Sequence, residues 1–184
     1  LYVNGSPTCP WSKHLSDIKT VNMNPNVTHI GHLAFYGCTA LTSVSIPESV
    51  TSIGDAAFEY CSSLASINIP NSVTTIGGSA FNGCISLISI NIPDSVTAIS
   101  HDTFYNCTSL TFVNIPDSVV SIDNGAFYSC SSLTSVNISK SVTCIENDAF
   151  SGCSSLASIT IPKSITSISD AAFENCSSLS DVYY

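Results

Sequence analysis

The sequence predicts a solenoid, a fold in which short structural repeats stack along one axis. Phenylalanine, cysteine and leucine each recur at every 23rd residue, and no insertion or deletion interrupts the series. A fixed period of about 20 to 50 residues indicates stacked supersecondary units, none of which buries its apolar side alone. Because the apolar residues keep fixed positions in every unit, we expect one long, thin core.

We call each 23-residue unit a rung and each set of equivalent positions a column. The phenylalanine column is Phe35, Phe58, Phe81, Phe104, Phe127, Phe150 and Phe173. The cysteine column is Cys38, Cys61, Cys84, Cys107, Cys130, Cys153 and Cys176. The leucine column is Leu41, Leu64, Leu87, Leu110, Leu133, Leu156 and Leu179.

The main strand of each rung follows its leucine. In the spacing Leu41-x-x-Val44-x-Ile46, Val44 and Ile46 lie two residues apart and so point to the same side of a strand. Proline then ends the strand, because it cannot donate a hydrogen bond to a neighbouring strand. The prolines are Pro47, Pro70, Pro93, Pro116 and Pro162, and Ser139 interrupts their column.

Two further elements complete each rung. A second short extended segment over residues 50–53 turns Val50 and Ile53 inward. After a turn rich in glycine and aspartate, the spacing Phe58-x-x-Cys61 is typical of one helical turn, since positions i and i+3 share a helix face.

Seven such rungs cover residues 24–184, and residues 1–23 form a degenerate N-terminal capping turn. Ile18, Val21 and Met23 fall one period before the first full strand, while Trp11 and Cys9 belong to the cap. Terminal repeats are atypical because they close the core. The chain starts at Leu1 rather than methionine, so we expect a mature form or an excised fragment.

The charge balance excludes two classes of partner. The chain has 13 acidic residues against four lysines, no arginine, and a net charge of −9. Nucleic acids and anionic membrane surfaces are bound through clusters of lysine and arginine, which this chain lacks. No apolar run approaches the ~18 residues that a membrane-spanning helix needs.

At these repeats the chain resembles leucine-rich repeats. Leu41-x-x-Val44-x-Ile46 matches their L-x-x-L-x-L core. The repeated Ile-Pro-x-Ser-Val and Ala-Phe-x-x-Cys-x-Ser-Leu segments are similar to the BspA-like, Treponema-type subclass over about residues 18–184. The resemblance implies a right-handed curved coil of short parallel strands with brief helical turns.

For function, the resemblance implies a cell-surface or secreted protein that adheres to host matrix proteins or other cells. It brings no catalytic residues and no cofactor. The ligand of a leucine-rich repeat lies on the concave face, which the outward residues of the main strands form. On that face we expect a binding site at Ile88, Asn91, Phe112, Asn114, Ser135 and Asn137.

Phe112 and Ile88 motivate this site because they interrupt columns of mostly small polar residues. Phe112 stands where the neighbouring rungs have Ser89 and Ser135, and Ile88 is followed in its column by Thr111. An exposed aromatic residue beside an exposed aliphatic one is typical of an interface anchor. The alternative is a scattered pair of surface hydrophobic residues without a binding role.

The cysteine column predicts reduced, buried thiols. Zinc sites use closely spaced cysteine pairs, which are absent, and parallel side chains in a stack do not point at one another as a disulfide requires. Free cysteine behaves as a small buried hydrophobic residue. Cys144 and Cys9 lie outside the column; Cys144 is either an exposed thiol able to cross-link chains or a half-buried inert one.

Acidic residues in the turns offer one metal hypothesis. Asp123 and Glu146 share a column on successive rungs, with Asp102 and Asp148 close by, and calcium would relieve their repulsion. A solvated acidic turn explains the same residues without a metal, and no Asp-x-Asp-x-Asp-Gly loop is present.

No catalytic motif is recognisable, so we expect a non-enzymatic protein. No serine lies in a Gly-x-Ser-x-Gly segment, and no glycine-rich phosphate loop occurs. The leading hypothesis is a module that binds a host matrix or cell-surface protein. The alternatives are a homo-oligomer or filament assembled through an open C-terminal rung, and an ice- or surface-binding protein.

Overall fold

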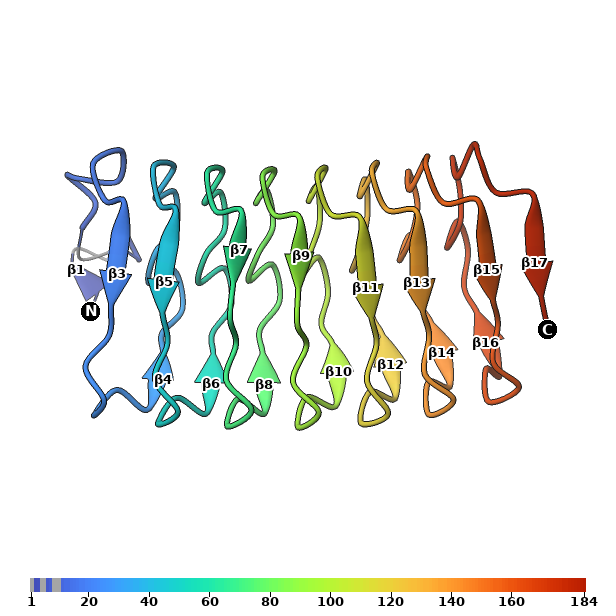
Figure 1. Cartoon of the computed structure of the whole chain (residues 1–184), viewed down its shortest axis with the longest axis horizontal. Helices are drawn as coiled ribbons and strands as arrows, with labels where there is room; N and C mark the ends of the chain where they lie inside the picture. The colour runs from blue at the N-terminus through green and yellow to red at the C-terminus, as the bar shows by residue number, and fades with distance from the viewer. Residues whose placement is uncertain (1, 4–5, 8–10) are drawn as a thin grey trace.

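A computed structural model describes residues 2–3, 6–7 and 11–184 and shows a parallel β-solenoid of 23-residue rungs (Figure 1). Each rung contributes one main strand of two or three residues and one second strand of two residues, and the repeat pattern predicts both strands. The described residues contain no α-helix, and hence none that is long and apolar enough to cross a membrane.

The strands form two series that alternate along the chain. The main strands are β3 (Thr20–Asn22), β5 (Ser43–Ser45), β7 (Ser66–Ile67), β9 (Ser89–Ile90), β11 (Phe112–Asn114), β13 (Ser135–Asn137), β15 (Ser158–Thr160) and β17 (Asp181–Tyr183). The second strands are β4 (His29–Ile30), β6 (Ser52–Ile53), β8 (Thr75–Ile76), β10 (Ala98–Ile99), β12 (Ser121–Ile122), β14 (Cys144–Ile145) and β16 (Ser167–Ile168).

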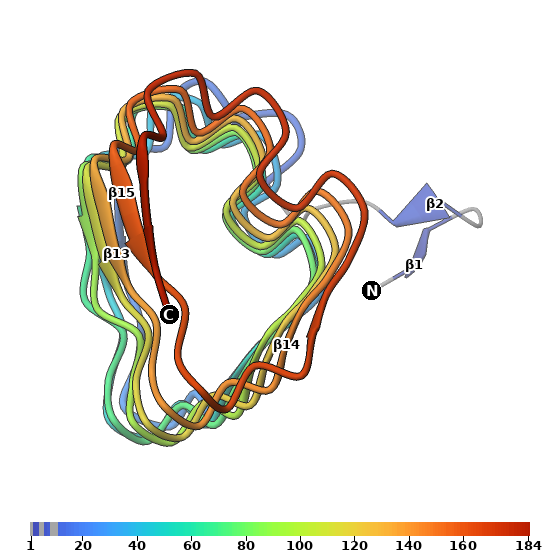
Figure 2. The same ribbon diagram turned by 90° about the vertical axis from the view of Figure 1, so that its right-hand side faces the viewer.

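Every pairing within these series is parallel and offset by one repeat. Val113 of β11 pairs with Val136 of β13, and Ile122 of β12 pairs with Ile145 of β14. Down the long axis the rungs therefore superimpose (Figure 2). The register places equivalent residues side by side, so each column runs straight along the molecule and buried residues pack on copies of themselves.

The phenylalanine column forms a continuous stack through the interior. Successive rings from Phe35 to Phe173 have centroids 5.2–5.7 Å apart and interplanar angles of 15° or less. Offset stacking of this kind is a favoured arrangement of aromatic pairs. From Phe58 to Phe150 the side chains are fully buried, which confirms the predicted core.

The N-terminal segment extends the same stack. The Trp11 ring packs on Phe35 with centroids 5.9 Å apart, and its indole N–H donates to the Ala34 carbonyl at 2.7 Å. Ile18 and Met23 pack partly buried against the core. Two short antiparallel strands, β1 (Tyr2–Val3) and β2 (Ser6–Pro7), lie beside the solenoid (Figure 2).

The segment predicted as a brief helical turn is a series of tight turns, so that detail of the prediction is wrong. Ala56 and Tyr60 adopt the left-handed conformation, with φ of 53° and 60°. The Cys61 N–H donates to Phe58 in its own rung, whereas the Phe58 N–H donates to Ala80 in the next rung. A helix would use both N–H groups internally, so a solenoid that bonds its rungs through this segment cannot keep a helix there.

The cysteine column also links the rungs. Each thiol donates to the carbonyl oxygen of the phenylalanine in the preceding rung, from Cys61 onto Phe35 to Cys176 onto Phe150, with Sγ···O distances of 3.2–3.3 Å. All seven column cysteines are buried and none is in a disulfide. Burial raises the pKa of Cys84 and of Cys130 to about 12, so these thiols stay protonated.

Candidate binding face

The exposed residues of the main strands, with the residue before each strand, form one face that we call the strand face. All six residues of the predicted site are exposed on it: Ile88, Asn91, Phe112, Asn114, Ser135 and Asn137. They lie on or beside β9, β11 and β13. Phe112 pairs in register with Ser89 and with Ser135, so these residues occupy three adjacent rungs.

Three large apolar side chains are exposed on two adjacent rungs, Ile88 and Phe112 on this face and Ile85 three residues before Ile88, and we call them the apolar patch. Ile85, Ile88 and Phe112 are 43%, 53% and 48% exposed. The hydroxyls of Thr108 and Thr111 donate to the carbonyls of Ile85 and Ile88 at 3.4 and 3.3 Å, which holds the two rungs together here. A group of exposed apolar residues on a polar face is typical of an interaction site.

Our sequence reasoning missed Ile85. Its column otherwise holds threonine or serine, namely Thr39, Ser62, Thr108, Ser131, Ser154 and Ser177. The signal that revealed Phe112 and Ile88, an apolar residue in a polar column, was therefore present for Ile85 as well. Ile85 lies three residues before Ile88, outside the columns of the main strand, so those columns do not reveal it.

Beyond the patch, β11 and β13 present paired side-chain amides. The Asn137 Nδ2 donates to the Asn114 Oδ1 at 2.7 Å. Both residues are exposed, and the pair leaves one amide N–H₂ and one carbonyl oxygen without a partner among the described residues. Two neighbouring rungs thus offer a donor and an acceptor side by side.

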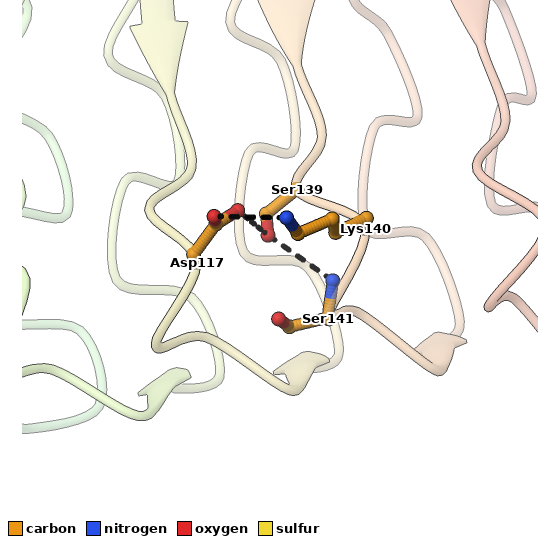
Figure 3. A network of polar contacts seen from close by, with 4 residues as sticks. All are labelled: Asp117, Ser139, Lys140 and Ser141. Carbon is orange, nitrogen blue, oxygen red and sulfur yellow. Dashed lines mark hydrogen bonds and ion pairs between the residues drawn. The ribbon is translucent and has the colours of Figure 1, made fainter.

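A polar hollow of about 650 Å³ continues from these amides beyond the ends of the strands. Figure 3 shows its central contacts. The Ser139 hydroxyl donates to the Asp117 Oδ1 at 2.7 Å, and the Lys140 Nζ lies 3.7 Å from the Asp117 Oδ2. The Ser141 N–H donates to the Ser139 hydroxyl oxygen at 3.1 Å, which fixes that hydroxyl in turn.

The opposite side of the solenoid carries a column of threonines that precedes the second strands. Its members are Thr28, Thr51, Thr74, Thr97, Thr143 and Thr166, with Val120 in the same column. Several of their hydroxyls donate to the carbonyl of the preceding rung, as Thr74 does to Thr51 at 3.2 Å. Val120 is 50% exposed, which makes it a useful control for the apolar patch.

An apolar hollow of about 480 Å³ lies at the first rung and is lined by residues such as Val21, Met23 and Phe35, with Trp11 at its side. These side chains are the first members of the columns that form the interior. The hollow is therefore the end of the core, and Thr20, Asn22 and His29 are the polar side chains among its lining residues.

The acidic residues considered for calcium lie in the turns on the other side of the rung. Asp123 and Glu146 are half-buried, and the Glu146 Oε2 accepts a hydrogen bond from Ser169 at 3.1 Å. Asp102 and Asp148 both occupy left-handed positions, two rungs apart. Within the part of the chain that the structure describes, no three His, Cys, Asp or Glu side chains gather as metal ligands.

Cys144 is half-buried on β14. Burial raises the pKa of its thiol, and the nearby Glu146 carboxylate raises it further. The thiol is therefore less reactive than a free cysteine, in keeping with the inert alternative. Cys9 lies outside the described residues.

Three solved structures show the same architecture. The leucine-rich repeat protein of T. pallidum is 35% identical with a TM-score of 0.83, over 88% of this chain and 78% of that one. A leucine-rich repeat protein from Bacteroides ovatus is 30% identical with a TM-score of 0.78, over 92% of this chain and 50% of that one. A leucine-rich cell surface protein from Faecalibacterium prausnitzii is 29% identical with a TM-score of 0.56, over 93% and 61%.

The chain thus spans half the length of the B. ovatus protein. None of the curated proteins compared with it matches. The model of the BspA type leucine-rich repeat region matches in six copies, over residues 13–111 and 97–184. Together with the 23-residue rungs and their stacked columns, this match shows that the chain belongs to the BspA-type leucine-rich repeat family.

Proposed function

We propose that this chain is a non-catalytic binding module that adheres to a protein of the host matrix or of a cell surface, and that it acts outside the cell or on its surface. The observation that carries the proposal is the apolar patch of Ile85, Ile88 and Phe112, which are exposed at positions where neighbouring rungs carry mostly small polar residues. The description of the F. prausnitzii relative as a cell surface protein supports the location.

The energetics of interfaces favour the patch as the anchor. A few residues carry most of the binding energy of an interface, and they lie where large side chains lose water on binding. Serine and threonine in the surrounding columns bury little apolar area, so they contribute complementarity rather than affinity. Asn91 and Ser135 flank the patch and complete the polar surround.

The experiment is a binding screen against extracellular-matrix and cell-surface proteins, followed by measurement of Kd for each ligand found. The test variant changes Ile85→Thr, Ile88→Thr and Phe112→Ser together, which restores the residues that neighbouring rungs carry. The expected result is a Kd at least tenfold higher, corresponding to about 1.4 kcal/mol. Because the new residues already occur in these columns, the fold should not change.

Val120→Thr is the matched control, since it also replaces an exposed apolar residue by the threonine of its column. It lies on the opposite side of the rung, so it should leave Kd unchanged. Equal affinities for the triple variant and the wild type would overturn the proposal, as would an equal loss in the control.

We also propose residues 1–23 as a capping turn that precedes seven rungs over 24–184. The packing of Trp11 on Phe35 and of Met23 against the core supports this division. Deleting residues 1–23 should expose the first rung and lower the midpoint of thermal unfolding. An unchanged midpoint would contradict a capping role.

End-to-end assembly is the second candidate function, and one observation favours it. Among the described residues β17 pairs with β15 alone, and Val182 and Tyr183 are 42% and 57% exposed. An unpaired strand edge with apolar residues is a template for pairing with another chain. Light scattering over a concentration series tests the candidate, and a monomer at all concentrations would contradict it.

A further inference from the structure

The repeat is also interrupted at Ser139, two residues after β13. This residue replaces the proline that stands in the same column on the rungs before and after it, Pro116 and Pro162. A proline ring has no hydrogen-bonding group, whereas the Ser139 side chain is 95% buried and still donates to Asp117. The exchange therefore creates a polar contact between rungs that a proline at this position cannot make.

That contact fixes a carboxylate at the surface. Asp117 receives the Ser139 hydroxyl on one oxygen and faces Lys140 with the other, so its orientation is held from two sides (Figure 3). Asp94 is the residue equivalent to Asp117 on the preceding rung. The position equivalent to Ser139 is there Pro116, which has no hydroxyl to donate to Asp94. A binding group that is already oriented loses less entropy when a ligand binds.

The same hollow holds further hydrogen-bonding groups. Asn114 and Asn137 line it together with Asp117, Ser139 and Lys140. The Asn pair supplies a free donor and a free acceptor, and each Asp117 oxygen has a second lone pair available. A volume of about 650 Å³ lies within the ~300–1,000 Å³ range of small-molecule sites.

The charges in the hollow decide what kind of ligand fits. Lys140 offsets the charge of Asp117, which leaves Asp94 as the one uncompensated charge among the lining residues. The lining holds two carboxylates and one ammonium, so neither an anion nor a cation would meet charges of one sign only. Alternating donors and acceptors with little net charge instead suit neighbouring hydroxyl groups, each of which donates and accepts.

We propose that this hollow binds a neutral carbohydrate, with Asp117 and the Asn114–Asn137 pair hydrogen-bonding adjacent sugar hydroxyls. Ser139 acts as a positioning residue, because it is buried and its hydroxyl donates to Asp117. The site is separate from the apolar patch, so it stands whether or not the patch binds a protein.

The test begins with an array of neutral oligosaccharides built from glucose, galactose, mannose and N-acetylglucosamine. Sialylated and sulfated glycans on the same array probe anion binding, and an oligolysine peptide probes cation binding. The expected result is saturable binding of at least one neutral glycan, with a Kd that does not change between 50 and 300 mM salt. Binding of a charged probe would instead weaken with salt and would overturn the proposal.

Variants then assign the bound glycan to the hollow. Asp117→Ala and Asn114→Ala should each raise its Kd at least tenfold, and Ser139→Pro should raise it severalfold while the protein remains as stable as the wild type. Asp170→Ala, which removes an exposed carboxylate elsewhere, should change nothing.

Two results would refute the site: no neutral glycan binds, or the bound glycan keeps its affinity in Asp117→Ala. Ser139→Pro guards against a folding artefact, since proline already occupies this column in neighbouring rungs. The proposed protein ligand should bind Ser139→Pro normally, so failure of this inference and failure of the proposed function can be told apart.

Discussion

The apolar interior and the strand face share one 23-residue period, but they differ in how strictly they keep it. Inside, phenylalanine and cysteine occupy their columns in all seven rungs. On the strand face, the columns are interrupted at Ile88 and Phe112, and Ser139 interrupts the prolines that follow. Each interior side chain packs on copies of itself, so one misfit disturbs both neighbours, whereas an outward side chain meets mainly solvent. Departures on the face therefore mark where the surface is specialised.

The largest expected effect is the difference in free energy of unfolding between the variants Phe104→Ala and Phe112→Ala. Phe104 is fully buried between Phe81 and Phe127, so its removal should lower the free energy of unfolding by about 3–5 kcal/mol through lost burial and a cavity. Phe112 is half exposed, and its truncation should change stability by about 0.5 kcal/mol or less. Urea denaturation measures both. Similar losses would mean that the interior is no more constrained than the face.

Alkaline unfolding tests the buried thiols. Burial raises the pKa of Cys84 and Cys130 from 9.0 to about 12. Above pH 9 the unfolded thiols lose protons that the folded state keeps. Their contribution to stability is therefore complete below pH 9 and falls as the pH rises to about 12. The loss is up to about 1.4 kcal/mol per pH unit for each thiol.

Denaturation of wild type and Cys130→Ala at several pH values between 9 and 12 measures this dependence. The variant should show a slope that is shallower by up to about 1.4 kcal/mol per pH unit, while tyrosine and lysine contribute equally to both proteins. Parallel slopes would contradict the assignment of this loss to the thiol column.

The smallest expected effect concerns the left-handed turns. Ser129 and Gly152 occupy equivalent positions with φ of 56° and 75°. Glycine adopts this conformation without strain, so Ser129→Gly should raise the free energy of unfolding by about 0.5–1 kcal/mol, even after the greater entropy that glycine gives the unfolded chain. Gly152→Ala should lower it by a similar amount, because the new Cβ would lie 3.1–3.4 Å from Ser129. Thermal unfolding of both variants measures the difference, and shifts of the same sign would contradict this explanation.

Much of the fold could be predicted because each column carries a repeated signal. Val44 and Ile46 indicated the inward side of the main strand, and Pro47 its end. The turn at Phe58 and Cys61 was harder, because an i, i+3 pair fits a helix and a tight turn equally well. The segment forms a turn because its backbone N–H groups donate hydrogen bonds to the next rung. These hydrogen bonds join residues 22 positions apart, such as Phe58 and Ala80.

The candidate site was predictable only in part. Phe112 and Ile88 interrupt their columns, and this is visible in the sequence. Ser139 interrupts its column as well, but its importance depends on the hydrogen bond to Asp117, which lies 22 residues earlier in the chain. Residue types at that separation say nothing about orientation.

The sequence by itself determined the period, the rung and the identity of the buried columns, because burial of apolar groups acts on residue type and spacing alone. Only the tertiary structure decided which backbone hydrogen bonds form within a rung and which form between rungs. It also decided which side chains of different rungs are in contact. Those choices depend on distances between residues one period apart, which no local pattern encodes. The stacked phenylalanines could be predicted from the amino-acid sequence. The orientation of the Asp117 carboxylate arises only when two rungs lie side by side.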